Sequence, residues 1–182
     1  LEATINTLVW SSLGLVYHYR SRVSEYLQNY YKICSRILMV MAVLNYLVVL
    51  TVLNPIWGHE TVATTPLWNI LLGAYGMPVI VALFCLKFFD KRFSKYAAIT
   101  AGFTLFVFIC LEIRHLWQQR LDISLPTSDG ELYTYSIVWL LMATGTILAA
   151  AGLRIQGLHR AGMGLLLLVV AKIFLVDMSD LE

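Results

Sequence analysis

The sequence predicts an all-α fold, a polytopic transmembrane helix bundle of about six spans. Three observations predict it: the composition, a series of six apolar runs, and the confinement of most lysines and arginines to alternate connections. Of the 182 residues, 59% are hydrophobic and 13% are charged, whereas soluble domains carry about 25% charged residues. A soluble fold of this length cannot bury so much apolar surface, so we expect lipid to cover part of it.

The six apolar runs have close to the length that crosses a bilayer, for which a helix needs roughly 17–25 residues. No run alternates with a period of two. This favours helices over barrel strands, since a helix pairs every backbone amide within its own segment. The whole chain, 1–182, is therefore expected to be a single transmembrane helical region. Its spans are placed at about residues 1–19, 37–53, 67–86, 97–117, 134–153 and 161–177.

The segment 20–36 is too polar to span the bilayer. Its three tyrosines can share one helical stripe with Leu27 and Cys34, while Arg22 and Lys32 face elsewhere. This pattern predicts an interfacial amphipathic helix on the membrane surface. A water-exposed connecting helix is the alternative.

Lysine and arginine are distributed unequally between the two sets of connections. The segments after the first, third and fifth spans are basic, whereas 54–66 holds neither residue type and 118–133 holds only Arg120. By the positive-inside rule the basic connections face the cytoplasm. All five tryptophans fall at the opposite boundary, where their amphipathic rings favour the headgroup layer. The basic residues are Arg20, Arg22, Lys32, Arg36, Lys87, Lys91, Arg92, Lys95, Arg154 and Arg160.

The fifth and sixth spans are rich in small residues and are joined by a short turn. Gly145 and Ala149 are two small residues four apart, a spacing that lets helices approach closely. We therefore expect these spans to form an antiparallel hairpin. In the third span, Gly73, Gly76 and Pro78 interrupt the apolar run, and a proline there can kink the helix.

Ionisable residues gather at the outer ends of the fourth and sixth spans. Glu112 and His115 share one helical stripe, Arg114 lies on another, and Asp177 follows Lys172 by about a turn. Charges inside a span are costly and by default mark function. The functional interpretation is a polar pocket in which Glu112 and His115 exchange a proton. Arg114 and Lys172 would hold an anionic group there.

The structural alternative for this cluster is ion pairing between helices, Glu112 with Lys172 or Arg114. Such pairs only neutralise charge near the membrane surface. Both interpretations remain open on the sequence alone.

Other chemistries find no support in the sequence. The histidines outside the cluster have no second ligand at metal spacing, and no Walker A, GxSxG, HExxH or dinucleotide fingerprint occurs. We expect no cofactor and no metal. A nucleic-acid partner is not expected either, because the basic residues lie in short clusters between apolar runs.

The second half of the chain resembles the family named domain of unknown function 2339, uncharacterised bacterial membrane proteins with many spans. The resemblance covers mainly residues 105–182. It is carried by the segment Leu111 to Leu116, by the segment Tyr133 to Leu141, and by the stretch from Arg160 to Asp177. It implies a multi-pass protein of the bacterial inner (cytoplasmic) membrane and supplies no catalytic residues.

Members of that family are longer than this chain. The chain begins at Leu1 and ends directly after an apolar run. We therefore expect it to be a fragment of a longer multi-span protein.

Three functions stay open, and membrane lipids are expected partners in each. The first is a transporter or permease-like module for a small or lipid-linked envelope molecule. The second is a structural or assembly subunit, whose small-residue faces bind other transmembrane helices of the same longer chain or of a complex. The third is a membrane enzyme acting on envelope glycan or lipid at the outer face, with His115 or Glu112 as the base.

Overall fold

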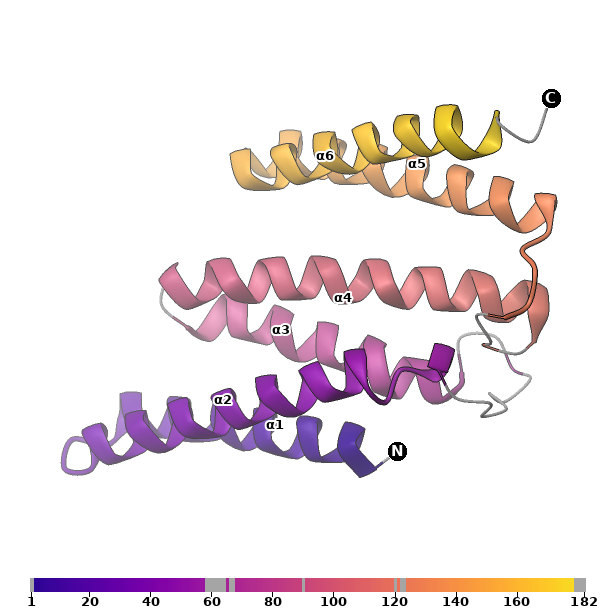
Figure 1. The fold of residues 1–182 in the computed structure, drawn as a ribbon. Coiled ribbons are helices and arrows are strands. Elements are labelled where there is room, and N and C mark those ends of the chain that lie inside the picture. The colour runs from indigo at the N-terminus through magenta and orange to yellow at the C-terminus, as the bar shows by residue number, and fades with distance from the viewer. Residues whose placement is uncertain are drawn as a thin grey trace. The chain divides into compact units, whose positions relative to one another are not determined.

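The computed structural model describes residues 2–57, 65, 68–89, 91–119, 121 and 124–178. All regular secondary structure in these residues is helical, which confirms the predicted all-α class. The chain forms two compact units, 1–124 and 125–182, and each is considered by itself. Figure 1 labels six α-helices in chain order: α1 (Glu2–Val23), α2 (Gln28–Thr51), α3 (Met77–Phe88), α4 (Lys91–Gln118), α5 (Asp129–Leu153) and α6 (Gln156–Lys172).

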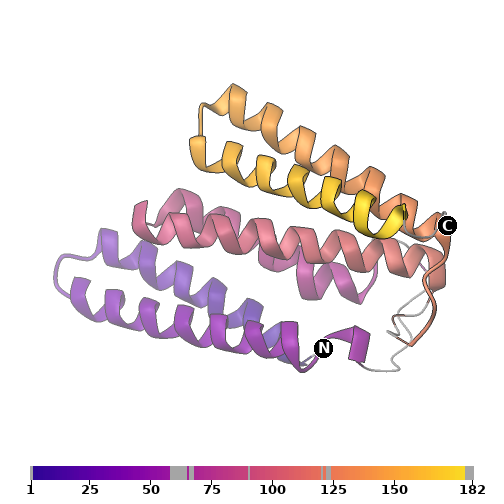
Figure 2. The same cartoon turned by 45° about the horizontal axis from the view of Figure 1, so that its top comes forward.

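Helices α1 and α2 form a hairpin and lie side by side in both views (Figures 1 and 2). Small residues let helices approach closely where lipid gives no hydrophobic drive. At Gly14 of α1 the approach is so close that a Cβ atom would lie 3.1 Å from Met39 Cγ of α2. The buried face of α1 carries only small or hydroxyl side chains, at Thr4, Thr7, Ser11, Gly14 and Ser21.

Hydrogen bonds satisfy the polar groups of this hairpin. Hydroxyls of α1 donate to backbone carbonyls three or four residues back. Three bonds cross between the helices. Ser35 Oγ donates to the Gly14 carbonyl at 2.8 Å, and Asn45 Nδ2 donates to Thr7 Oγ1 at 2.8 Å and to the Ala3 carbonyl at 2.5 Å. The hairpin therefore buries polar side chains without leaving these donors unpaired.

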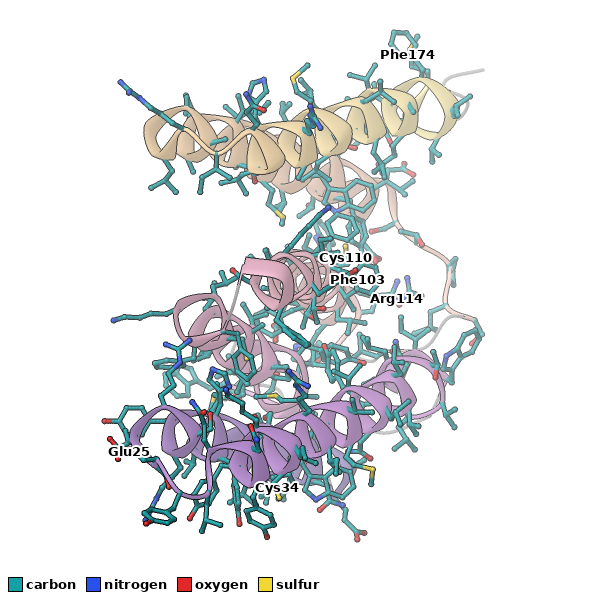
Figure 3. The ribbon with its side chains drawn as sticks, turned by 90° about the vertical axis from the view of Figure 1, so that its left-hand side faces the viewer. Glu25, Cys34, Phe103, Cys110, Arg114 and Phe174 are labelled. Carbon is teal, nitrogen blue, oxygen red and sulfur yellow. The ribbon has the colours of Figure 1, made fainter. Side chains whose placement is uncertain are left out.

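The segment 20–36 does not form the separate interfacial helix predicted from its sequence. Helix α1 continues through Val23, and α2 begins at Gln28, so the segment is divided between two helices. Packing explains the difference: Ser21 and Ser35, near its two ends, are both buried. Contact between the helices outweighs the amphipathic pattern of the tyrosines. Figure 3 shows Glu25 at the bend between the two helices and Cys34 on α2.

Four helical stretches in the described residues are long and apolar enough to cross a membrane: Gln28–Trp57, Phe93–Gln118, Asp129–Leu153 and Gln156–Asp177. The prediction of about six spans is thus confirmed for four of them. A fifth stretch, Leu72–Lys87, is apolar but shorter. Helix α1 is not among the four, and its buried hydroxyl-bearing face makes it more polar than the others.

A π-helical turn, η2 (Leu72–Gly76), runs directly into α3. Pro78 stands at the start of α3, just after this turn. A π-turn shifts the hydrogen-bond ladder away from the usual i→i−4 pairing, and it therefore accommodates a residue that lacks an N–H group. The stretch packs on α4 through a core of Leu71, Ala74, Tyr75, Phe108 and Leu111.

The second unit is the antiparallel hairpin of α5 and α6 that the sequence predicts. Ser128 caps α5, since its side chain accepts a hydrogen bond from the Glu131 N–H at 3.3 Å. A short turn follows, with Arg154 in the left-handed conformation. Beyond α6 the chain continues as a second π-helical turn, η3 (Ile173–Asp177).

The predicted packing step of Gly145 and Ala149 is wrong. Both residues are exposed, and a Cβ atom at Gly145 would meet nothing within 4 Å. The close approach is instead at Gly162 of α6, where a Cβ atom would lie 2.7 Å from Ile147 Cγ1 and 3.3 Å from the Ala143 carbonyl oxygen. The spacing of small residues was recognised, but the face of α5 that packs was not.

Substituting Gly162 with leucine should separate the α5–α6 hairpin. The new side chain would collide with backbone atoms of α5, which cannot move aside as a flexible side chain can. We expect a loss of about 2 kcal/mol in the free energy of unfolding, typical of overpacking, measured by thermal unfolding of the purified protein in detergent. Gly164→Leu is the matched control, because a Cβ atom there meets open space. Equal losses in the two variants would contradict this packing.

Candidate functional site

The first unit holds a buried polar group formed by Asn69, Glu112 and His115. Glu112 is 5% exposed and His115 is 2% exposed, both on α4. Asn69 Nδ2 donates a hydrogen bond to Glu112 Oε1 at 2.9 Å. The other carboxylate oxygen of Glu112, Oε2, lies 4.0 Å from His115 Nδ1. The spacing of three residues on α4 thus brings Glu112 and His115 together, as the sequence predicts.

Asn69 has two roles in this group, and the sequence prediction missed it. Its Oδ1 accepts hydrogen bonds from the N–H groups of Leu71 and Leu72, at 2.9 and 3.3 Å. These bonds cap the start of the helical stretch. The opposite end of the same amide holds Glu112. An asparagine immediately before an apolar run is an N-cap signal, which could have identified the residue.

His115 is the unusual member of the group. Both its ring nitrogens are buried and have no hydrogen-bond partner among the residues that the structure describes. Buried polar groups in native proteins nearly always have a partner, so an exception calls for an explanation such as a bound molecule, an ion or a catalytic role. The 4.0 Å separation from Glu112 is too long for a hydrogen bond. His115 is therefore the side chain in this unit that is most clearly prepared to bind something else.

Arg114 lies between these two residues in sequence, near the end of α4 (Figure 3). It is half-buried. Residues two positions apart in an α-helix, such as Glu112 and Arg114, are separated by about 200° around its axis. Arg114 therefore does not share the stripe of Glu112, and its place in the predicted cluster stays a prediction.

A second set of buried polar groups in this unit was not predicted. The hydroxyl of Tyr46 on α2 donates to Thr104 Oγ1 on α4 at 3.1 Å. Tyr75, in the π-helical turn, is completely buried, and its hydroxyl has no hydrogen-bond partner in the described part of the chain. Tyrosine in an apolar run is ambiguous in sequence, because its ring packs as a hydrophobic group.

In the second unit, Lys172 and Asp177 form a buried ion pair. Lys172 Nζ lies 2.6 Å from Asp177 Oδ1, and the side chains are 12% and 6% exposed. The same ammonium group donates to Ser136 Oγ at 2.7 Å and to the Leu132 carbonyl at 2.9 Å. Ser136 Oγ donates in turn to Asp177 Oδ2 at 2.6 Å. The three donors of the lysine are all used within this unit.

The π-helical turn η3 makes this pair possible. In an α-helix, residues five apart lie about 140° apart around the axis. In a π-turn the i→i+5 pairing brings such residues to the same face, and the Met178 N–H indeed bonds to the Ile173 carbonyl at 3.0 Å. Lys172 immediately precedes this turn, and Asp177 is its last residue. The predicted cluster therefore divides into Glu112 with His115 in one unit and Lys172 with Asp177 in the other.

Outside these groups, the remaining histidines show no common site. His18 stacks on Phe89 with ring centroids 4.0 Å apart, His159 lies near the start of α6, and His59 falls outside the described residues. Across the part of the chain that the structure describes, no three His, Cys, Asp or Glu side chains are placed to hold one metal ion. Glu131, which the sequence places near the mouth of the fifth span, is completely buried.

Asp177→Asn should destabilise the second unit strongly. It leaves the Lys172 charge buried without a carboxylate, and breaking one half of a buried ion pair costs about 3 kcal/mol. The double variant Lys172→Met with Asp177→Asn removes both charges and should recover most of that loss. Unfolding of the purified protein in detergent measures both effects. If the double variant is as unstable as the single one, the two side chains are not coupled.

A family model described as "Predicted membrane protein (DUF2339)" matches residues 1–182. The match therefore extends well upstream of 105–182, the part over which the resemblance was recognised in the sequence. Neither a curated protein nor a solved structure matches the chain. With its long apolar helices and a family match over its whole length, the chain belongs to the DUF2339 family of predicted membrane proteins.

Proposed function

We propose that this protein is a transporter-like module of the bacterial inner membrane, acting on a small or lipid-linked envelope molecule. The Glu112–His115 pair, held by Asn69, would receive a proton or the polar part of the cargo. The observation that carries the proposal is His115, buried beside a carboxylate with neither ring nitrogen hydrogen-bonded in the described residues. An ionisable pair at membrane depth is a frequent feature of proton relays and substrate paths.

Two features of the first unit support a site that changes state. Asn69 connects the Glu112 carboxylate directly to the backbone that begins the helical stretch before α3. The π-helical turn η2 follows within the same stretch, and such turns are found frequently at functional sites. A change in the charge of Glu112 would therefore act on the N-cap of a helix that is already irregular.

The proposed topology has six spans with the basic connections in the cytoplasm. Helix α1 lies along α2, and α2 belongs to a stretch long and apolar enough to span. A neighbour packed along such a helix lies at the same membrane depth, and its hydroxyls are already hydrogen-bonded. The stretch Leu72–Lys87 packs on α4 in the same way. Lysine and arginine at the bends after α1, α3 and α5 favour the cytoplasmic side.

Glu112→Gln and His115→Phe should each abolish transport while leaving the fold intact. Cells lacking the wild-type protein would be compared with complemented cells for uptake and release of a panel of labelled solutes and envelope precursors. A solute whose uptake or release differs between the two kinds of cell is the cargo. We expect each variant to lower that flux at least about tenfold, since a lost charged hydrogen-bonding group is worth roughly 1.5–3 kcal/mol. Glu25→Gln is the control, an exposed carboxylate at the α1–α2 bend.

The orientation is tested separately by cysteine labelling. In a variant without the native cysteines, Lys95→Cys should be labelled by a membrane-impermeant reagent only after the cells are opened. Thr127→Cys, in the opposite connection, should be labelled in intact cells. Both positions are exposed. Labelling of residue 95 in intact cells would contradict the proposed topology and indicate the opposite orientation.

An assembly role is the second candidate, and one observation favours it. Gly145, Ala149 and Gly152 fall within one stripe of α5, are all exposed, and leave open space beside both glycines. Such a small-residue face suits a further helix. Substituting Ala149 with leucine should then release a partner that co-purifies in mild detergent, without affecting the transport assay.

A further inference from the structure

The turn between α5 and α6 carries a basic cavity. It has a volume of about 520 Å³ and is lined by Ala150, Arg154, Ile155, Gln156, His159 and Arg160. Three of these six side chains are basic or can become so. Ala150 is buried and the other five residues are exposed, so the cavity combines a small apolar floor with a cationic edge.

No carboxylate of the described residues is paired with this edge. Within the residues that the structure describes, Arg154, His159 and Arg160 take part in no ion pair. Among the described residues of the second unit, the acidic side chains Asp129, Glu131 and Asp177 lie at the other end of the hairpin. Helix α5 has 25 residues, which separates Asp129 from the cavity by about 36 Å. The described carboxylates of this hairpin are thus separated from the arginines of its turn, and one of them, Asp177, is paired with Lys172.

That separation is close to the thickness of a membrane, whose hydrocarbon core measures about 30 Å. Both α5 and the stretch containing α6 are long and apolar enough to span. A cavity at the turn that joins them lies at the depth of the lipid headgroups. The phosphate of a phospholipid is the anion that is concentrated at this depth, and Arg recognises phosphate through paired hydrogen bonds.

Arg154 adds an observation from the backbone. It adopts φ 55° and ψ 37°, the left-handed conformation at the end of α5. Glycine is the residue that favours this position, because the Cβ atom of any other residue crowds the backbone in the left-handed conformation. An arginine therefore stands where glycine would give a more stable turn, at the edge of the cavity.

We propose that this cavity is a binding site for the phosphate of an anionic phospholipid, held by Arg154 and Arg160 with His159 beside them. Ile155 and Ala150 offer an apolar surface to the adjoining glycerol and acyl groups. The site is independent of the Glu112–His115 group, which lies in the other unit. It would anchor the α5–α6 turn to the lipid surface.

Native mass spectrometry of the purified protein tests the proposal. The probes are phosphatidylglycerol, phosphatidylcholine and inorganic phosphate at equal concentration. The variant Arg154→Gln with Arg160→Gln should bind phosphatidylglycerol about tenfold more weakly than the wild type. The control, Arg20→Gln with Arg22→Gln, removes two charges from the exposed end of α1 and should bind normally. An equal loss in the control, equal binding of phosphatidylcholine, or equally tight binding of inorganic phosphate would overturn the proposal.

A second variant separates binding from stability. Arg154→Gly relieves the left-handed conformation, so the melting temperature should rise while phosphatidylglycerol binding falls. A purely structural Arg154 would give the rise without any change in lipid binding, and that result would also overturn the proposal. Transport through the Glu112–His115 group is measured independently, so the two proposals can fail separately.

Discussion

The constraint that governs this structure is that a polar group surrounded by hydrocarbon must find its partner within the chain. Helix α1 meets it locally, because Thr7, Ser11 and Ser21 each donate to a carbonyl one turn back. Ser35 and Asn45 meet it across the hairpin. Lys172 meets it through three bonds to groups on α5 and on the turn that follows α6. Hydrogen bonding therefore contributes, together with apolar contact, to which helix faces are turned inward.

The sequence predicted the features that depend on local periodicity and on charge. Apolar runs of near-membrane length predicted the helices, and the short turn between the last two runs predicted the α5–α6 hairpin. The three-residue spacing of Glu112 and His115 placed them together. These features need no knowledge of which helix lies beside which. The separate helix expected over 20–36 is not formed, for the opposite reason: the outcome depends on how Ser21 and Ser35 pack between α1 and α2, which the local pattern does not show.

Departures from the α-helix account for most of the contacts that could not be predicted from the sequence. Lys172 and Asp177 stand five residues apart, a spacing that predicts no contact in an α-helix, and only the turn η3 brings them together. Asn69 reaches Glu112 across 43 positions of the chain. A hydrophobic pattern carries no information on the register of two packed helices, which is also why the close approach at Gly162 could not be told from the small-residue step at Gly145 and Ala149. Long-range register is the information that the single sequence lacks.

The two buried ionic groups differ in completeness, and this difference supports different roles. Lys172, Asp177 and Ser136 satisfy one another, which is what a group selected for stability requires. The Glu112–His115 group is incomplete, since the ring of His115 gains no hydrogen bond from the described residues. Leaving such a ring buried is costly unless something else binds it for part of the time. Stability alone would favour an apolar side chain at residue 115, and the buried histidine there is the observation on which the proposed function rests.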